Sequence, residues 1–175
     1  MAGAYLYGWD ATNKVWVKLT CDADGKVILD PDSKYTDAKA RAACKLSGSL
    51  YWSCPGIHFD ASNPGSDPVL KAGDSYIRAL ADSLYFGAQV NLPNGATITG
   101  VVVYGNAAAE AETWSLQRIT MSDRTVLEMA TTYIGNEDVT VTSPVVDNSL
   151  YAYFLFTSSL DTNDEIWGAR ITYII

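Results

Sequence analysis

Apolar and polar positions alternate along most of the chain, and clusters of turn-forming residues separate the alternating stretches. The clearest stretch covers residues 90–106, where Leu92-Pro93-Asn94-Gly95 has the chemistry of a tight turn. After this turn, residues 96–104 are rich in β-branched side chains and are apolar on both faces. A strand of this kind lies centrally in a sandwich or against a neighbouring structure. We therefore expect residues 96–104 to form the central strand of an all-β domain.

Further strands are expected at residues 76–80, 84–90, 112–121, 126–133, 139–142, 150–158 and 166–175. Short strands at this spacing, with turns and no helix between them, predict an antiparallel, jelly-roll-like β-sandwich of about eight strands. Within residues 112–121, Trp114 and Leu116 share one phase of the alternation, while Ile119 and Met121 share the other. This change of phase predicts a β-bulge.

Two of these strands are apolar on both faces. In residues 150–156, the set that could face the core is Leu150, Ala152, Phe154 and Phe156, and the opposite set is Tyr151, Tyr153 and Leu155. In the last strand, Trp167, Ala169, Ile171 and Tyr173 share one face, with Ile166 and Ile174 on the other. Because the outer sheet face of a monomer is normally polar, we expect it to be covered by the N-terminal segment, by the loop at residues 46–75, or by another subunit.

Residues 1–49 have a different organisation. Residues 5–9, 15–20 and 26–29 alternate between turns and predict a three-strand meander, and the alanine-rich residues 36–45, with Thr36 as N-cap, predict one short helix. A meander of this size buries too little apolar surface to be stable by itself. We therefore expect residues 1–49 to serve as an attachment or oligomerisation segment. Three turn clusters make residues 50–75 an irregular connecting loop, with strand-like pieces at residues 50–52 and 57–59, before a β-sandwich domain at residues 76–175.

The formal net charge is −8, and all of it arises in the second part of the chain. Residues 1–71 contain eight basic and eight acidic side chains, whereas residues 72–175 contain four arginines and twelve acids. This distribution argues against a nucleic-acid partner, which requires clustered cations. The N-terminus has neither the basic region nor the apolar region of a signal peptide, and no apolar run reaches transmembrane length. We expect a soluble protein made in the cytoplasm, without membrane insertion.

The three cysteines, Cys21, Cys44 and Cys54, form no C-x-x-C pair, which argues against a structural zinc site. Either all three are free thiols in a reducing compartment, or a disulfide such as Cys44–Cys54 leaves one thiol over. The single histidine, His58, lies between two apolar residues, so we expect it to be a partly buried structural residue.

The sequence contains no nucleophile elbow, zinc-protease motif, P-loop or dinucleotide-binding glycine pattern. The nearest approaches to a glycosidase-like carboxylate pair are Glu110 with Glu112 and the adjacent Glu137 and Asp138. Neither spacing predicts a cleft. We therefore assign no catalytic residue and no cofactor, and we expect the protein not to be an enzyme.

Two weaker patterns concern ligands. Asp161, Asn163 and Glu165 form a D-x-N-x-E triplet whose oxygens could hold Ca²⁺, but it lacks the glycine and the distal acid of an EF-hand loop, so we assign no metal site. Aromatic residues such as Trp52, Trp114 and Tyr133 could form a platform for stacking sugars, although most tryptophans alternate onto expected core faces.

A resemblance covers roughly residues 5–43. Trp9-Asp10, Trp16, Leu19 and the D-A-D-G-K-V turn at residues 22–27, followed by Y-T-D-A at residues 35–38 and Ala40, resemble a module of phage-type virion proteins. In that module a W-D…W-x-x-L-x-x-D-x-x-G meander and a Y-T-D-A-x-A helix precede a β-sandwich. LPNGATITGVVVYGN and the closing GARITY strand resemble sandwich domains of similar structural and surface proteins. The resemblance implies a class of protein and transfers no catalytic or binding residues.

Three functions follow from these observations. The main hypothesis is a non-enzymatic virion structural protein, located in the virion as a capsid decoration, head-fibre or tail component. Its partners would be copies of itself, expected as a homotrimer, and other virion proteins. The alternative is a carbohydrate-binding or adhesion module that recognises surface glycans through aromatic residues and Asp-rich loops. The third is a glycan-active enzyme, which would need two carboxylates facing one pocket.

Overall fold

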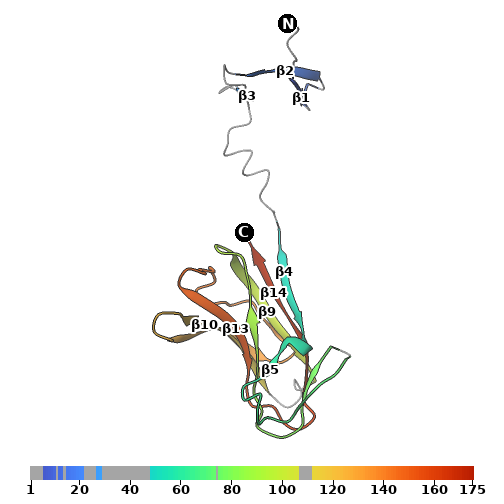
Figure 1. Ribbon diagram of the computed structural model, residues 1–175, viewed down its shortest axis with the longest axis vertical. Helices are drawn as coiled ribbons and strands as arrows, with labels where there is room; N and C mark the ends of the chain where they lie inside the picture. Colours follow the sequence, from blue (N-terminus) through green and yellow to red (C-terminus); the bar gives the residue numbers. More distant parts are fainter. Residues whose placement is uncertain are drawn as a thin grey trace. The chain divides into compact units, whose positions relative to one another are not determined.

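The computed structural model describes residues 6–10, 12–13, 15–21, 27–28, 48–73, 75–106 and 112–175. The chain divides into two compact units, Met1–Leu46 and Ser47–Ile175 (Figure 1). The predicted helix at residues 36–45, together with Cys44 and Glu110, lies outside the described residues. Among the described residues, no helical segment has the length and apolar character needed to cross a membrane.

The first unit contains an antiparallel sheet of three strands in the order β1 (Leu6–Asp10), β2 (Val15–Cys21) and β3 (Val27–Ile28). Strands β1 and β2 pair with Trp9 opposite Trp16, so the short turn between them sets the register. The predicted three-strand meander is therefore confirmed, because each strand pairs with its neighbour in sequence. Its role in attachment remains a prediction.

The second unit is a sandwich of two antiparallel sheets. The five-stranded sheet has the order β11 (Val126–Tyr133), β10 (Thr113–Thr120), β13 (Tyr151–Thr157), β8 (Phe86–Val90) and β5 (Asp60–Ala61). The six-stranded sheet has the order β12 (Glu137–Asp138), β9 (Thr97–Gly105), β14 (Glu165–Ile174), β7 (Ile77–Ala79) and β6 (Val69–Lys71), and β4 (Leu50–Pro55) also pairs with β14. These sheets confirm the predicted all-β sandwich.

The expectation that residues 50–75 form an irregular connecting loop was wrong. Strand β4 pairs with β14 from Leu50 opposite Tyr173 to Pro55 opposite Gly168, while β5 pairs with β8 and β6 with β7. The expected strand piece at residues 57–59 overlaps a 3-10 helix, η1 (Gly56–His58), and His58 is exposed rather than partly buried. The expected strand piece at residues 50–52 is part of β4. The rest was missed because β4 and β5 pair with strands distant in sequence, and because β6 is a short strand between turn clusters that pairs with the nearby β7.

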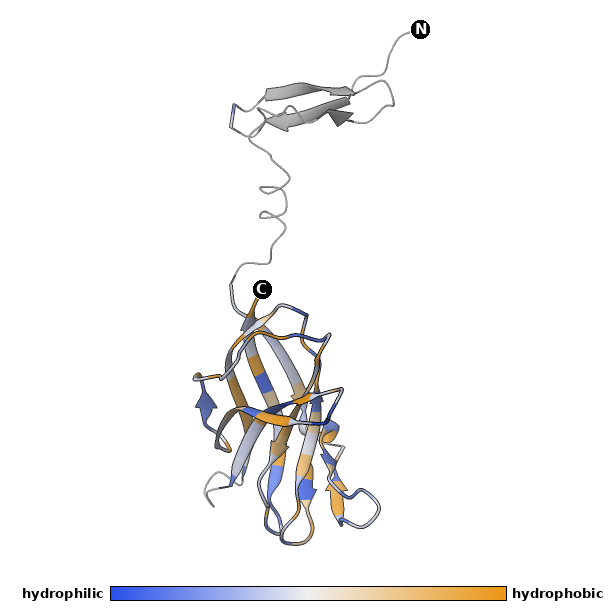
Figure 2. Cartoon of the chain, turned by 90° about the vertical axis from the view of Figure 1, so that its left-hand side faces the viewer, coloured by the Kyte–Doolittle hydropathy of each residue, from blue (hydrophilic) through white to orange (hydrophobic). Residues whose placement is uncertain are grey.

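The core lies between the two sheets, where side chains from both inner faces meet. Its largest fully buried members include Trp114, Phe59, Phe86, Ile77, Leu116 and Met129. Hydrophobic and hydrophilic residues alternate along several strands (Figure 2), as expected for sheets with one face in the core. Trp114 is completely buried, and its indole nitrogen donates a hydrogen bond to the backbone oxygen of Asn136 at 3.2 Å.

Bulges decide which residues face outwards. The bulge predicted within residues 112–121 was wrong: β10 pairs with β13 without a register shift, and the shift in its pairing with β11 places the extra residue, Met129, on β11. A second shift, between Ile166 and Gly168 of β14, was not predicted. It buries Ile166, Ala169 and Ile171 together and leaves Trp167 52% exposed, so the expectation that Trp167 shares a face with Ala169 was wrong.

Strand β13 faces the core through the set opposite to the one expected. Tyr153, Leu155 and Thr157 are buried, whereas Phe154 and Phe156 are only half-buried. The buried polar atoms have partners: the Tyr153 hydroxyl accepts a hydrogen bond from the backbone N–H of Asp147 at 2.8 Å, and Thr157 Oγ1 accepts one from the backbone N–H of Phe86 at 2.9 Å. Because these partners satisfy the hydroxyls, a tyrosine and a threonine can occupy the inner face and two phenylalanines the outer one.

Candidate functional site

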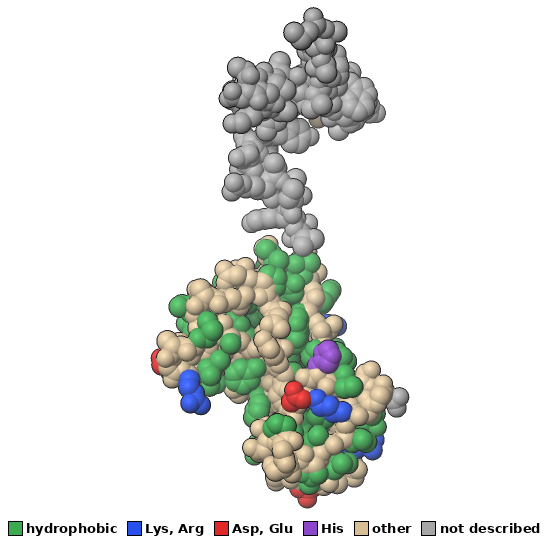
Figure 3. All heavy atoms as spheres, in the orientation of Figure 1, with side chains coloured by type: hydrophobic (Ala, Val, Ile, Leu, Met, Phe, Trp, Pro, Cys, Tyr) green, Lys and Arg blue, Asp and Glu red, His purple; other side chains and the backbone are tan. Residues whose placement is uncertain are grey.

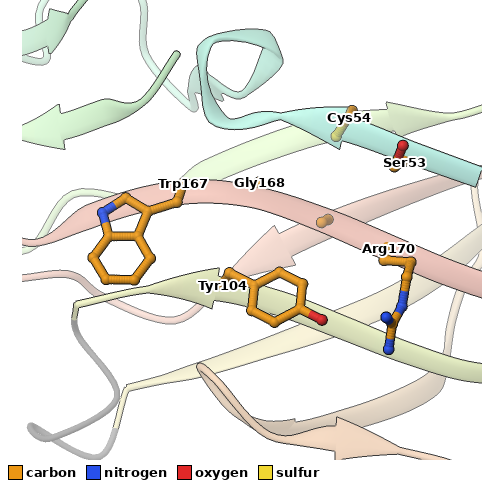
Figure 4. Close-up of a pocket in the computed structure, with 7 residues that line it drawn as sticks. Ser53, Cys54, Tyr104, Trp167, Gly168 and Arg170 are labelled. Carbon is orange, nitrogen blue, oxygen red and sulfur yellow. The ribbon is translucent and has the colours of Figure 1, made fainter. Parts of the chain in front are cut away.

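A shallow groove of about 520 Å³ opens on the outer face of the six-stranded sheet, over β4, β9 and β14 (Figure 4). It is lined by Ser53, Cys54, Tyr104, Trp167, Gly168, Ala169 and Arg170. Figure 4 shows the rings of Trp167 and Tyr104 and the side chain of Arg170 following one another along the groove. The site is thus built on strands, which hold side chains more precisely than loops do.

Gly168 forms the floor of the groove because no side chain fits there. It pairs with Tyr104 on one side and with Pro55 on the other. A Cβ atom at position 168 would lie 2.7 Å from the backbone oxygen of Cys54, a distance that real Cβ atoms do not show. The glycine therefore lets β4 approach β14 closely, and the bulge beside it turns the Trp167 side chain out of the sheet.

The indole of Trp167 is held in place by a chain of polar contacts. Its Nε1 donates a hydrogen bond to Oε2 of Glu165 at 2.9 Å, while Oε1 of Glu165 accepts two from the Arg78 guanidinium, one of them from Nε at 2.8 Å. Arg78 also donates to the Tyr76 hydroxyl at 3.1 Å and lies over the Tyr76 ring. The hydrogen bonds from Trp167 and Arg78 hold the pKa of Glu165 below its ordinary value. The indole edge is thus fixed while the side chain as a whole remains half exposed.

Arg170 supplies the positive charge of the groove. Its Nη2 lies 3.5 Å from Oε1 of Glu137, and its guanidinium carbon lies 5.8 Å from the ring centre of Tyr51. Its Nε is buried and has no hydrogen-bond partner within the described part of the chain. The rest of the side chain is 41% exposed, so N–H groups of the guanidinium other than the buried Nε are suited to donating to oxygen atoms of a ligand.

Cys54 contributes surface to the groove but no reactive thiolate. Burial is the main cause that raises the pKa of its thiol to about 11, outweighing a backbone hydrogen bond from Ala169 that lowers it. At neutral pH the thiol is therefore protonated and a weak nucleophile. The structure leaves Cys54 free, and the alternative of a Cys44–Cys54 disulfide involves Cys44, which lies outside the described residues.

The acids considered as candidates have other roles. Glu137 and Asp138 are neighbours on β12, so their side chains point to opposite faces; Asp138 accepts hydrogen bonds from Thr140 and from the backbone of Thr131. Glu112 is buried. Glu137 and Asp138 therefore do not present two carboxylates to one cleft, as glycoside hydrolysis requires.

Two members of the Asp161, Asn163 and Glu165 triplet make contacts within the protein. Glu165 is held by Arg78 and Trp167, and the backbone oxygen of Asn163 accepts a hydrogen bond from the Asn106 side chain at 3.0 Å. No three acids, histidines or cysteines in the described ranges gather where they could hold a metal ion. Around residues 161–164, the polar contacts bind backbone atoms: the Asn106 side chain donates to the backbone oxygen of Asn163, and the Asp164 carboxylate accepts from the backbone N–H of Asp161.

The aromatic residues considered for sugar stacking are not the ones at the groove. Trp114 is in the core, Trp52 is packed against the core, and Tyr133 stands 50% exposed on the outermost strand, β11. Sequence reasoning missed Trp167 and Tyr104. The one available signal was Gly168, since an isolated glycine within a strand pattern indicates a bulge that shifts the phase of its neighbours.

No protein-family model matches the chain, and no curated protein matches it. Among solved structures, the C-terminal CBM6 of LamC, a marine laminarinase from Zobellia galactanivorans, is 13% identical with a TM-score of 0.41, covering 70% of this chain and 99% of its own. The xylan-binding module CBM15 is 13% identical with a TM-score of 0.38, covering 71% and 97%. The K1 cleaved adhesin domain of Lys-gingipain from Porphyromonas gingivalis W83 is 12% identical with a TM-score of 0.36, covering 71% and 98%. Similarities this low carry no argument about what this chain binds.

Proposed function

We propose that the Ser47–Ile175 sandwich is a non-catalytic carbohydrate-binding module and that the groove is its binding site. The observation that carries the proposal is the Trp167 indole, fixed at its edge by Glu165 and exposed beside Tyr104 over the bare backbone of Gly168. The ring faces of tryptophan and tyrosine attract the C–H groups on one face of a sugar ring. A fixed indole provides this contact without a large loss of side-chain entropy on binding.

The remaining groups of the groove suit the hydroxyls of a sugar. Arg170 offers N–H donors at one end, and the Ser53 side chain lies on the neighbouring strand, opposite Arg170 in the register. The groove is shallow and open, so it can accept a segment of a long glycan chain that extends beyond it at both ends. Aromatic surface with a few convergent polar groups is the usual composition of a ligand site.

The test is binding by isothermal titration calorimetry to xylan, the polysaccharide named with one of the similar solved structures, and to laminarin, followed by a glycan array. Trp167→Ala should weaken binding at least about tenfold, which corresponds to about 1.4 kcal/mol. The matched control is Tyr133→Ala, because Tyr133 is an equally exposed aromatic residue on the other sheet. Failure of the natural chain to bind any glycan, or equal binding by Trp167→Ala, contradicts the proposal.

A second candidate function is that of a virion structural subunit acting through homo-oligomeric assembly, with the Met1–Leu46 unit making the attachment. What supports it is the β1–β2–β3 sheet, which forms a compact unit of its own before the sandwich. Light scattering on the full chain tests it, with a homotrimer expected. A monomer at micromolar concentration that does not associate with virus particles contradicts it. The two functions are compatible, since an assembly protein can also bind glycans.

A further inference from the structure

The outer face of the five-stranded sheet carries a second aromatic surface, on the sheet opposite to the one that forms the groove. The strand register places the following residues on the outer side of its three central strands: Gly87 and Gln89 of β8, Ala152, Phe154 and Phe156 of β13, and Gln117, Ile119 and the buried Ser115 of β10. Hydrophobic side chains gather over β10 and β13 on the face seen in Figure 3. We call this set, with Tyr85, the second surface.

Two rings of the second surface lie nearly parallel. The ring centres of Tyr85 and Phe156 are 6.0 Å apart, with an angle of 10° between the planes. A Cβ atom on Gly87 would lie 3.2 Å from Cδ2 of Phe156, so the Phe156 ring extends over the neighbouring strand at the point where that strand has no side chain. Tyr85 is 40% exposed and Phe156 is half-buried, so the pair is accessible from solvent.

Uncharged polar groups flank the aromatic residues on both sides. Phe154 pairs with Gln89 on β8 and with Gln117 on β10, and in the next row Phe156 lies between Gly87 and Ser115. The Gln89 amide donates to the Asn91 side chain at 3.1 Å, and the Gln117 amide donates to Ser115 Oγ at 2.7 Å. Each glutamine therefore has a fixed amide with a carbonyl oxygen able to accept a hydrogen bond from a ligand hydroxyl.

Charged residues lie only beside these rows. None of the eight residues on the outer side of β8, β13 and β10 is charged. The Asp60–Lys71 ion pair, with 2.5 Å between Nζ and Oδ1, lies next to Gly87 towards the edge strand β5, and Glu128 lies opposite Gln117 on β11. Since a charged ligand would lose its hydration here without gaining an ion pair in exchange, the surface favours an uncharged ligand.

We propose that the second surface binds uncharged glycans, independently of the groove. Rings bordered by amides and hydroxyls match a sugar chain, whose C–H faces and hydroxyls alternate in the same way. The interface core between copies of a protein is typically more apolar than this pattern. The proposal extends the proposed function to a second site but does not require the groove to bind. Because the two surfaces lie on the outer faces of opposite sheets, one sandwich can hold two glycan chains and gain avidity on a dense glycan surface.

The test is calorimetry with laminarin and hydroxyethyl cellulose as uncharged probes and alginate as a charged one. It uses the full chain and the Trp167→Ala, Tyr85→Ala and double variants, with Tyr133→Ala as the control. We expect Trp167→Ala to retain binding to an uncharged probe, and the added Tyr85→Ala change to weaken that binding at least about tenfold. Tyr85 is a partly exposed residue, so its truncation should leave the fold intact, which circular dichroism verifies.

The outcomes separate the two proposals. If Trp167→Ala abolishes all binding, the proposal that the second surface binds glycans is contradicted, and the proposal that the groove binds them is supported. If Trp167→Ala leaves binding unchanged while Tyr85→Ala abolishes it, the proposal that the groove binds glycans is contradicted, and the proposal for the second surface is supported. Binding of alginate but of neither uncharged probe contradicts the proposal for the second surface. An absence of binding by the natural chain contradicts both proposals. If light scattering shows a dimer that Tyr85→Ala converts to a monomer, the face is an interface between copies of the chain and the glycan proposal fails.

Discussion

The indole Nε1 of Trp167 donates a 2.9 Å hydrogen bond to the carboxylate of Glu165, two residues earlier on the same strand. Side chains at positions i and i+2 of a strand lie on the same face, and here the bulge between Ile166 and Gly168 turns that face away from the core. The same carboxylate is held from the other side by Arg78 on β7. The orientation of the exposed aromatic residue is thus determined by two strands.

Replacing Glu165 should reduce ligand binding without removing any group of the groove surface. In Glu165→Ala the indole loses its hydrogen bond and gains rotational freedom, which must be lost again on binding. Ordering one such side chain costs about 0.5–1.5 kcal/mol, so we expect affinity to fall roughly two- to tenfold. Glu165→Gln is the control, because its amide oxygen can still accept the indole N–H. Calorimetry that finds Glu165→Ala equal to the natural chain contradicts this positioning role.

The same carboxylate should make stability depend on pH. The pKa of Glu165 is lowered in the folded state by its bonds to Trp167 and Arg78, so the unfolded state binds a proton more readily. The contribution of Glu165 to the free energy of unfolding is fully present above the ordinary glutamate pKa of about 4.3. It is lost as the pH falls through the lowered pKa of Glu165 in the folded state. Urea unfolding of the natural chain and of Glu165→Gln should therefore differ most near neutral pH, and the difference should shrink as the pH falls below the ordinary glutamate pKa. A difference that stays constant with pH contradicts the assignment.

Gly168 is expected to tolerate no side chain. In Gly168→Ala the added Cβ would meet the Cys54 backbone oxygen at 2.7 Å, so β4 must move away from β14. Overpacking of this kind costs about 1–3 kcal/mol, measured as the free energy of unfolding in urea. The control is Gly65→Ala, because a Cβ at this exposed position has no atom within 4 Å and should change stability by less than about 0.5 kcal/mol. Equal stability of the two variants contradicts the close approach.

The sequence predicted the class of fold and the meander correctly, because both depend on local patterns of alternation and turn chemistry, whereas the break in phase at residues 112–121 did not correspond to a bulge in that strand. It failed for short strands and for strands that pair with distant partners. Only residues 50–52 of β4 were expected as strand, because β4 is completed by the distant β14 and β5 by β8, while β6 is a short strand that pairs with the nearby β7. The groove was missed for a related reason, since hydrophobic alternation alone places Trp167 on the core face and only the bulge at Gly168 reverses it.

The inner face of β13 was also mispredicted, and the reason leads to a test. Tyr153 and Thr157 occupy the inner face because buried groups need their hydroxyls, and Thr157 Oγ1 accepts the backbone N–H of the fully buried Phe86. Thr157→Val keeps the shape but leaves that N–H unpaired, which costs about 1–3 kcal/mol. Thr157→Ser keeps the acceptor and loses only one methyl group, about 0.8 kcal/mol. Hydrogen exchange at the Phe86 amide separates the two effects: it should accelerate in Thr157→Val and remain protected in Thr157→Ser. Equal protection in both variants would show that the hydroxyl does not hold this strand pair.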